Sequence, residues 1–353
     1  MKFIHIADVH LGASPDIGSA RKGKREKEIW SSLENVLHVC EEQRIDFLLI
    51  AGDLFHRQPL KRELKELNYM FGRLKATKVV IVAGNHDYLR KDSYYWTFQW
   101  ESNVHMILSS DISCVEFPEY SLAVYGLSYH TREIREESYA KAFPGRRQGY
   151  EILLAHGGDD RHIPVKKEDL LELGYDYIAL GHIHRPQQIC PGKIAYSGAL
   201  EPTDKNDTGI HGYIAGEITA KGCQIKFVPA ASREYIHLEI PVHREMTGHA
   251  LKEEICRKLD EKGRENIYKV ILTGPRDPEN FFDLNELDPY GNIIEIVDST
   301  YPAYDFERLR AQNRENILGQ FIASFGDGLE GSIEYQALCE GVQALMETRK
   351  GSV

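Results

Sequence analysis

The sequence predicts a mixed α/β (α+β) fold: a two-sheet β-sandwich flanked by helices over residues 1–231, and a smaller α+β region over residues 232–353. Two observations predict it. In the first hundred residues, short apolar runs alternate with helical patterns, which is typical of parallel βαβ units. From about residue 104 the apolar runs are short and closely spaced with few helical stretches between them, which indicates a second sheet packed on the first.

Five short apolar runs each predict a strand that is buried on both faces. These runs are Phe3–Ala7, Phe47–Ala51, Val79–Ala83, Ile152–Ala155 and Tyr177–Leu180. A polar motif follows each run, in this order: Asp8-Val9-His10, Gly52-Asp53-Leu54-Phe55-His56, Gly84-Asn85-His86-Asp87, His156-Gly157-Gly158 and Gly181-His182-Ile183-His184. In open α/β sheets, sites are built at the C-terminal ends of the strands. We therefore expect the five motifs to converge on one site.

The remaining elements of the first region follow from spacing. Apolar residues at helical intervals predict amphipathic helices around residues 29–40 and 60–74. Further strands are predicted at 104–108, 122–126, 194–196, 212–217 and 224–228, and further helices at 131–142 and 166–173. An aromatic cluster from Tyr94 to Trp100 favours a packed loop over a base-stacking wedge.

The pattern changes near residue 231, where Ala230-Ala231-Ser232-Arg233 predicts a linker. Beyond it, strands are predicted at 235–240, 268–273 and 293–297, with helices near 247–262, 304–324 and 333–348. The terminal helices are amphipathic. The last one is expected either to pack on its own domain or to dock a partner.

Composition narrows the class of protein. The chain has 353 residues, with 42% hydrophobic and 27% charged residues, which is typical of a soluble globular protein. No apolar run approaches the ~18 residues of a membrane helix, and no signal-peptide core follows Lys2. The six cysteines lie far apart without a C-x-x-C pair, so we expect neither a cysteine metal cluster nor disulfides, and a cytoplasmic location.

The net charge of −11 is unevenly distributed. Residues 1–230 carry 29 Lys+Arg and 31 Asp+Glu, a net of −2, whereas residues 231–353 carry 14 and 23, a net of −9. This charge does not itself argue for a polyanionic substrate. The densest basic cluster runs from Arg21 to Lys27, and it is either a solvated helix start or a rim that contacts phosphates.

The motif side chains form a set with metal-binding chemistry: Asp8, His10, Asp53, Asn85, His156, His182 and His184. Carboxylate, imidazole and amide groups suit divalent metals such as Mn, Fe or Zn, and the absence of cysteine argues against a closed structural zinc site. Seven ligands are too many for one ion and fit two that share a bridging carboxylate. Such a pair stabilises the attacking and leaving oxygens of a phosphoryl displacement.

The order D-x-H, G-D, G-N-H-D, H and G-H-x-H resembles that of the calcineurin-like metallophosphoesterases. Leu11-Gly12 after the first motif and Leu54-Phe55-His56 in the second are similar to the SbcD/YhaO exonucleases and the Mre-type break-repair nucleases. The resemblance covers residues 1 to about 230. Beyond that point the chain is similar to the small capping and partner-binding domain of those nucleases.

The resemblance implies a role for each motif residue. One metal is held by Asp8, His10, Asp53 and His184, and the other by Asp53, Asn85, His156 and His182, with Asp53 bridging. His86 matches a catalytic histidine that contacts the scissile phosphate or protonates the leaving oxygen. His56 matches a second histidine linked to exonuclease action, although SbcD-like relatives often carry Asp there. Asp87 is expected to orient the loop or a ligand histidine.

The activity that the resemblance implies is a Mn-dependent 3′-to-5′ exonuclease acting on duplex DNA ends in DNA repair, with single-strand endonuclease activity also allowed. It further implies a homodimer and an ATPase partner of the SbcC or YhaN kind. Lys22, Lys24 and Arg25 are candidate DNA contacts. Two alternatives stay open: the same chemistry on a small substrate such as a cyclic nucleotide, and a DNA-end-binding scaffold with little catalysis. The Leu-Gly and Leu-Phe-His extensions favour DNA.

Overall fold

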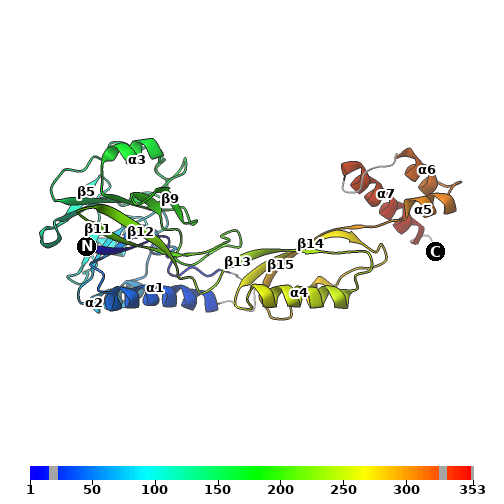
Figure 1. The fold of residues 1–353 in the computed structure, drawn as a ribbon, viewed down its shortest axis with the longest axis horizontal. Coiled ribbons are helices and arrows are strands. Elements are labelled where there is room, and N and C mark those ends of the chain that lie inside the picture. Colours follow the sequence, from blue (N-terminus) through cyan, green and yellow to red (C-terminus); the bar gives the residue numbers. More distant parts are fainter. Residues whose placement is uncertain (16–22, 326–331, 351–353) are drawn as a thin grey trace. The chain divides into compact units, whose positions relative to one another are not determined.

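The computed structural model describes residues 1–15, 23–325 and 332–350 (Figure 1). The chain divides into two compact units, Met1–Tyr235 and Ile236–Val353. The first unit contains two six-stranded sheets, and the second contains a three-stranded sheet and four helices within the described residues. No helix in the described ranges is long and apolar enough to cross a membrane.

The first sheet has the strand order β12-β11-β1-β2-β3-β4. Its strands are β1 (Lys2–Ile6), β2 (Phe47–Ala51), β3 (Lys78–Val82), β4 (Val104–Ile107), β11 (Gly212–Thr219) and β12 (Gly222–Pro229). Strands β1 to β4 run parallel, and β11 joins β1 antiparallel. Helices α1 (Lys24–Glu42) and α2 (Lys61–Gly72) pack on its outer face through apolar side chains.

The second sheet has the strand order β5-β6-β7-β8-β10-β9. Its strands are β5 (Ser113–Phe117), β6 (Leu122–Gly126), β7 (Tyr150–His156), β8 (Tyr177–Gly181), β9 (Gln187–Cys190) and β10 (Ile194–Tyr196). Helix α3 (Lys167–Leu173) lies on its outer face, so the sheets form the middle layers between α1 and α2 on one side and α3 on the other (Figure 1). Short 3-10 turns span Tyr94–Trp96 and Pro118–Tyr120.

The two sheets meet through alternating side chains. Because successive strand residues point to opposite faces, Leu48 packs toward α1 and α2, whereas Leu49 packs against the second sheet. Strand β2 contacts both β7 and β8 across this interface. The polar residues at the ends of these strands are therefore brought to a shared edge. This two-sheet sandwich confirms the predicted fold class.

Some predicted elements differ from the structure. Residues 131–142 do not form the predicted helix, because the backbone of Ile134 bonds instead to Arg161 and Ile163. Strands β5 and β9 were not predicted; β9 is a partly exposed edge strand with the sequence QQIC, which has no alternating apolar pattern.

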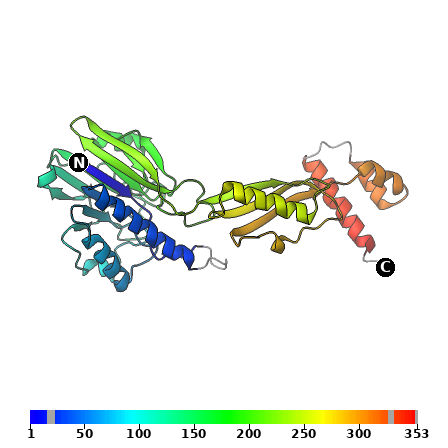
Figure 2. The same ribbon diagram turned by 60° about the horizontal axis from the view of Figure 1, so that its bottom comes forward.

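The second unit is built around the sheet β13-β14-β15. Its elements are β13 (Tyr235–Pro241), α4 (Gly248–Lys262), β14 (Ile267–Arg276), a 3-10 turn at Leu284–Glu286, β15 (Ile293–Pro302), α5 (Phe306–Gln312), α6 (Ile317–Ser324) and α7 (Ile333–Lys350). Figure 2 shows α4 lying along this sheet, where its apolar side chains are buried. The predicted helix at 304–324 is two helices, because the Asn316 side chain caps α6. Helix α7 packs on α6.

Candidate metal centre

The seven candidate ligands lie at the C-terminal ends of five strands. Asp8 and His10 follow β1, Asp53 follows β2, Asn85 follows β3, His156 ends β7, and His182 and His184 follow β8. The first sheet supplies four of them and the second sheet three. The structure brings all seven side chains together where the two sheets meet.

Short distances join ligand atoms from the two sheets. His10 Nε2 lies 3.1 Å from His184 Nε2. Asn85 Oδ1 lies 2.9 Å from His156 Nε2 and 3.1 Å from His182 Nδ1. Asp53 Oδ2 lies 3.5 Å from His156 Nε2.

The site contains buried carboxylates, whose negative charge is stabilised by positive charge nearby. This property fits metal binding. Burial raises the pKa of Asp8 to about 6, although the histidines beside it act to lower it. Burial also opposes ionisation of Asp53, but His156 outweighs it and holds the pKa of Asp53 below its ordinary value. Although burial disfavours its charged form, Asp53 raises the pKa of His156 to about 9. Without metal, protons on the histidines balance the negative charge of the buried carboxylates. Divalent cations bound to the same ligand atoms can replace those protons.

The backbone at the site is unusual. Asp8, His10, Asp53 and His182 have φ angles of 50°, 53°, 49° and 94°, in the left-handed region that residues with a side chain rarely adopt. Each such residue costs on the order of 1 kcal/mol or more. Four of the eight non-glycine residues with positive φ in the described part of the chain are thus candidate ligands.

Two glycines allow the close approach of the motifs. A Cβ on Gly84 would lie 2.2 Å from Asp53 Oδ1, and a Cβ on Gly52 would lie 2.2 Å from His156 Nδ1. Distances this short are not tolerated by any side chain. The glycine that precedes Asp53 and the one that precedes Asn85 are therefore required by the packing of the site.

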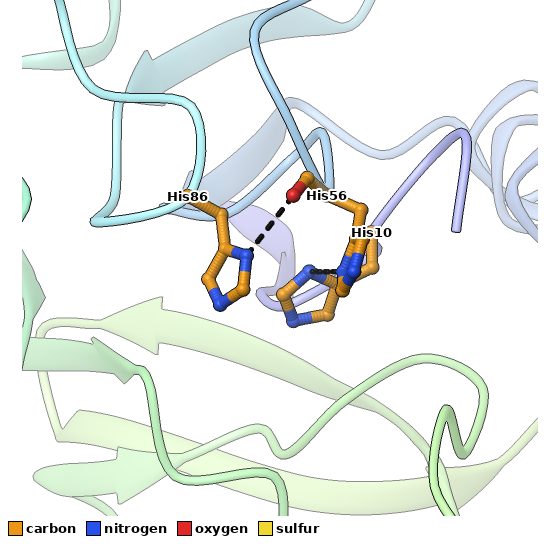
Figure 3. A group of neighbouring side chains, drawn as sticks. All are labelled: His10, His56 and His86. Atoms are coloured by element: carbon orange, nitrogen blue, oxygen red, sulfur yellow. Dashed lines mark hydrogen bonds between the residues drawn. The ribbon is translucent and has the colours of Figure 1, made fainter. Parts of the chain in front are cut away.

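The rings of His10, His56 and His86 lie beside one another, with His10 buried inside the site (Figure 3). His86 Nδ1 donates a hydrogen bond to the carbonyl oxygen of His56 at 3.0 Å. The rings of His56 and His86 are stacked, with centroids 4.9 Å apart. His56 Nδ1 lies 3.3 Å from His10 Nδ1, and burial, together with His86, lowers the pKa of His56. His56 is exposed and His86 is half-buried, so a substrate can reach both rings.

Residues 1–186, more than half of the chain, match the model of the calcineurin-like phosphoesterases. The chain belongs to this family. It is therefore a metal-dependent phosphoesterase, of a fold that uses a dinuclear metal site.

Relatives of this phosphoesterase match different shares of the chain. A metallophosphoesterase named YhaO from Bacillus subtilis is 28% identical over 85% of this chain and 77% of its own length. The DNA double-strand break repair protein Mre11 of Methanocaldococcus jannaschii is 33% identical over 59% of this chain and 58% of its own. The Mre11 of Methanopyrus kandleri is 26% identical over 77% of this chain and 64% of its own. The chain thus spans less than two thirds of both Mre11 proteins.

Asp87 lies behind the site of this phosphoesterase and is fully buried. Its carboxylate accepts hydrogen bonds from the backbone N–H groups of Gly84 and Phe55 and from the Tyr95 hydroxyl. Burial raises the pKa of Asp87 to about 7. Its bonds join the loop that carries Asn85 and His86 to the segment that follows Asp53.

The candidate DNA contacts of this phosphoesterase differ in their accessibility. Arg25 is fully buried and pairs with Glu28 and Glu201, so the expectation that it contacts DNA is wrong. Lys24 is exposed at the start of α1. Lys22 lies outside the described residues.

Two carboxylates at the site, Asp159 and Asp207, were not predicted from the sequence. Asp159 Oδ2 accepts a hydrogen bond from His182 Nε2 at 2.8 Å, and Asp207 Oδ2 accepts one from His184 Nδ1 at 2.8 Å. Asp159 follows the His156-Gly157-Gly158 motif directly, which was an available signal. Asp207 lies in a loop that follows no apolar run, so nothing in its surroundings singled it out.

Proposed function

We propose that this phosphoesterase is a nuclease that hydrolyses phosphodiester bonds at DNA ends, using two divalent ions, with Mn favoured over Fe or Zn. The observation that carries the proposal is the arrangement of two reachable histidines, His56 and His86, at the rim of a buried set of metal-binding side chains. Two relatives are DNA double-strand break repair proteins, which supports DNA as the substrate.

The proposed ligand sets share one carboxylate. Asp8, His10, Asp53 and His184 hold one ion, and Asp53, Asn85, His156 and His182 hold the other. When bound, the ions supply a Lewis acid for the phosphoryl oxygens and a source of activated water. Asp53 suits the shared position because its two oxygens have different partners: Oδ1 accepts the His86 N–H, and Oδ2 faces His156.

His86 is the proposed catalytic acid. Its Nδ1–H is held by the carbonyl oxygen of His56, so the proton that the ring exchanges with substrate is the one on Nε2. From this position the ring can donate a hydrogen bond to the scissile phosphate or protonate the leaving oxygen. His56, which stacks on His86 and is exposed, is proposed to contact the same DNA end.

The DNA-binding surface and the partners are also part of the proposal. Lys24 remains a candidate phosphate contact at the start of α1. The net charge of −9 over residues 231–353 argues against broad phosphate contact there. We propose that this acidic second unit serves assembly, as a homodimer and with an ATPase partner, or caps the site.

The test uses end-labelled linear duplex DNA incubated with the protein in Mn, in Mg and with EDTA, alongside His86→Ala. We expect Mn-dependent shortening that EDTA and the variant abolish, and the labelled end gives the polarity. No cleavage by the wild-type protein would rule out autonomous nuclease action. Cleavage of a cyclic nucleotide in its place would identify a small-substrate phosphodiesterase. DNA-end binding without cleavage would identify a scaffold.

A further inference from the structure

His182 and His184 turn opposite ring nitrogens toward the candidate metal centre. His182 bonds Asp159 through Nε2, at 2.8 Å, and directs Nδ1 to the site, 3.1 Å from Asn85 Oδ1. His184 bonds Asp207 through Nδ1, at 2.8 Å, and directs Nε2 to the site, 3.1 Å from His10 Nε2. The two histidines are separated by a single residue, Ile183, yet each binds its carboxylate through a different ring nitrogen.

The Asp159 carboxylate is held in place by its own loop. Its Oδ1 accepts hydrogen bonds from the backbone N–H groups of Arg161 at 2.8 Å and His162 at 3.0 Å. Its Oδ2 lies 2.8 Å from His182 Nε2 and 3.0 Å from His162 Nδ1. Both contacts are made from the turn that follows β7.

The Asp207 carboxylate is held in a similar way. Its Oδ2 accepts hydrogen bonds from the backbone N–H and the hydroxyl of Thr203, both at 3.2 Å. The loop closes through a bond from the Asp207 N–H to the Asp204 carbonyl oxygen. The Asp207 side chain is 18% exposed and that of Asp159 is 48% exposed, so solvent screens the bond to His184 less.

An ionised carboxylate accepts hydrogen bonds and donates none, so its histidine partner must keep its proton on the nitrogen that faces it. The other ring nitrogen then presents a lone pair, as a metal ligand requires. A backbone acceptor has the same effect on His156. Its Nδ1 donates a hydrogen bond to the Ala51 carbonyl oxygen at 2.9 Å, which leaves the lone pair on Nε2.

We propose that Asp159 and Asp207 are positioning residues, one for each proposed metal position. Asp159 fixes His182 for coordination through Nδ1, and Asp207 fixes His184 for coordination through Nε2. The proposal rests on the two-metal site of the proposed function. It assigns a role to two carboxylates that stand outside the seven candidate ligands.

A competing arrangement shares Asp159. Ligand atoms of Asp159, His162 and His182 lie within 4.8 Å of one another, so this group can also be considered as a separate cation site. The two arrangements make different use of His162. His162 Nδ1 lies 2.9 Å from Asp159 Oδ1 and 3.0 Å from Asp159 Oδ2. If Asp159 positions His182, then His162→Ala removes one support of the carboxylate, and both ions still bind with a smaller loss than in Asp159→Ala. If the group binds an ion directly, His162→Ala removes that ion.

The first experiment measures Mn²⁺ binding to the chelator-treated, full-length protein by calorimetry and metal analysis. Asp159→Ala and Asp207→Ala are each expected to lower the affinity for one of the two ions by about 10- to 100-fold. The larger loss is expected for Asp207→Ala. Asp159→Asn and Asp207→Asn retain an oxygen acceptor and keep part of the affinity. Asp160→Ala, at the exposed neighbouring carboxylate, is the control and binds as the wild type does.

The second experiment separates positioning from a general effect on folding. In protein labelled with ¹⁵N-histidine and loaded with Zn²⁺, NMR spectra distinguish histidines bound through Nδ1 from those bound through Nε2. The wild type is expected to show one Nδ1-bound ring, His182, and Asp159→Ala is expected to lose that signature while Asp207→Ala retains it.

The failures of the two proposals are distinguishable. A wild-type protein that binds fewer than two ions overturns the two-metal site, and the positioning role with it. A wild type that binds two ions, with both alanine variants matching its affinities and its ¹⁵N signature, overturns the positioning role alone. Loss of an ion in His162→Ala assigns Asp159 as a ligand instead.

Discussion

The ring of His86 is held by the backbone carbonyl oxygen of His56, not by the His56 imidazole, through a hydrogen bond of 3.0 Å from Nδ1. The backbone N–H of His86 also donates to Asp53 Oδ1 at 2.8 Å. Both hydrogen bonds that hold His86 therefore survive the loss of the His56 side chain, and only the stacking of the two rings is lost. The contributions of the two histidines can be separated by mutation.

His86→Ala is expected to lower the cleavage rate by about 10²- to 10⁴-fold, the usual contribution of a general acid or base. His56→Ala is expected to cause a smaller loss, because the carbonyl group that orients His86 remains. Single-turnover rates on end-labelled duplex DNA at saturating Mn compare the two variants. Equal losses would mean that the His56 ring takes part in the same chemical step.

Gly84→Ala is expected to abolish binding of at least one metal ion. The added Cβ would lie 2.2 Å from Asp53 Oδ1, so the carboxylate must leave its position. Gly248→Ala is the matched control, because no atom lies within 4 Å of its added Cβ. Metal analysis after dialysis measures both. Full metal content in Gly84→Ala would contradict the proposed role of Asp53 as the shared ligand.

Mn²⁺ is expected to raise the thermal unfolding midpoint, and EDTA to reverse the increase. A ligand that binds only the folded protein stabilises it by about 2.7 kcal/mol at 100 times its dissociation constant. Differential scanning fluorimetry across a Mn²⁺ series measures the shift, with Asp53→Asn as the variant that loses most of it. A midpoint that does not depend on Mn²⁺ in the wild type would argue against a site in the folded protein.

Glu201→Ala is expected to lower the free energy of unfolding by about 3–5 kcal/mol, as expected when a buried charge pair loses one partner. Glu201 is fully buried and accepts hydrogen bonds from Arg25, the Ser32 hydroxyl and the Ser232 N–H. Urea unfolding measures the loss. Glu254→Ala removes a partly exposed partner of Arg257, which keeps Glu261, and should cost less than about 1 kcal/mol. Similar losses in the two variants would show that burial does not decide the outcome.

Stability should fall between pH 7 and pH 5 in part because of His5. Burial lowers the pKa of His5 to about 3, whereas the unfolded chain has a value of about 6.5. The unfolded state therefore binds the extra proton first, so the contribution is complete above pH 6.5 and is lost as the pH falls toward 3. The loss from pH 7 to pH 5 is about 2 kcal/mol. Urea unfolding of EDTA-treated wild type and His5→Gln should show a smaller pH dependence in the variant. Equal dependence would place the titration elsewhere.

The sequence was sufficient to predict the strands that position the site. Strand β2 is an uninterrupted apolar run, and β3 is one after Lys78, and runs of this length are typical of strands buried on both faces. Because motif residues such as Asp53 and Asn85 follow these runs directly, their convergence could be predicted from parallel-sheet geometry alone.

Other features depend on partners that are distant in the sequence. Arg25 belongs to a basic run, and its burial depends on Glu201, 176 residues away. The segment around Ile134 has helical composition, but its backbone bonds to the loop at Arg161 and Ile163. Asp207 gains its place at the site only because its loop returns to His184. Local patterns carry no information about such contacts.

The candidate metal centre lies across the boundary between the two sheets, with Asp53 and Asn85 on one side and His156 and His182 on the other. Ions bound there would act as a cross-link between the two halves of the sandwich. Metal loading would then govern how often these halves separate, and so the lifetime of the protein in the presence of a protease. Removal of the ions would then make the folded protein easier to cleave by proteases, in addition to removing its chemistry.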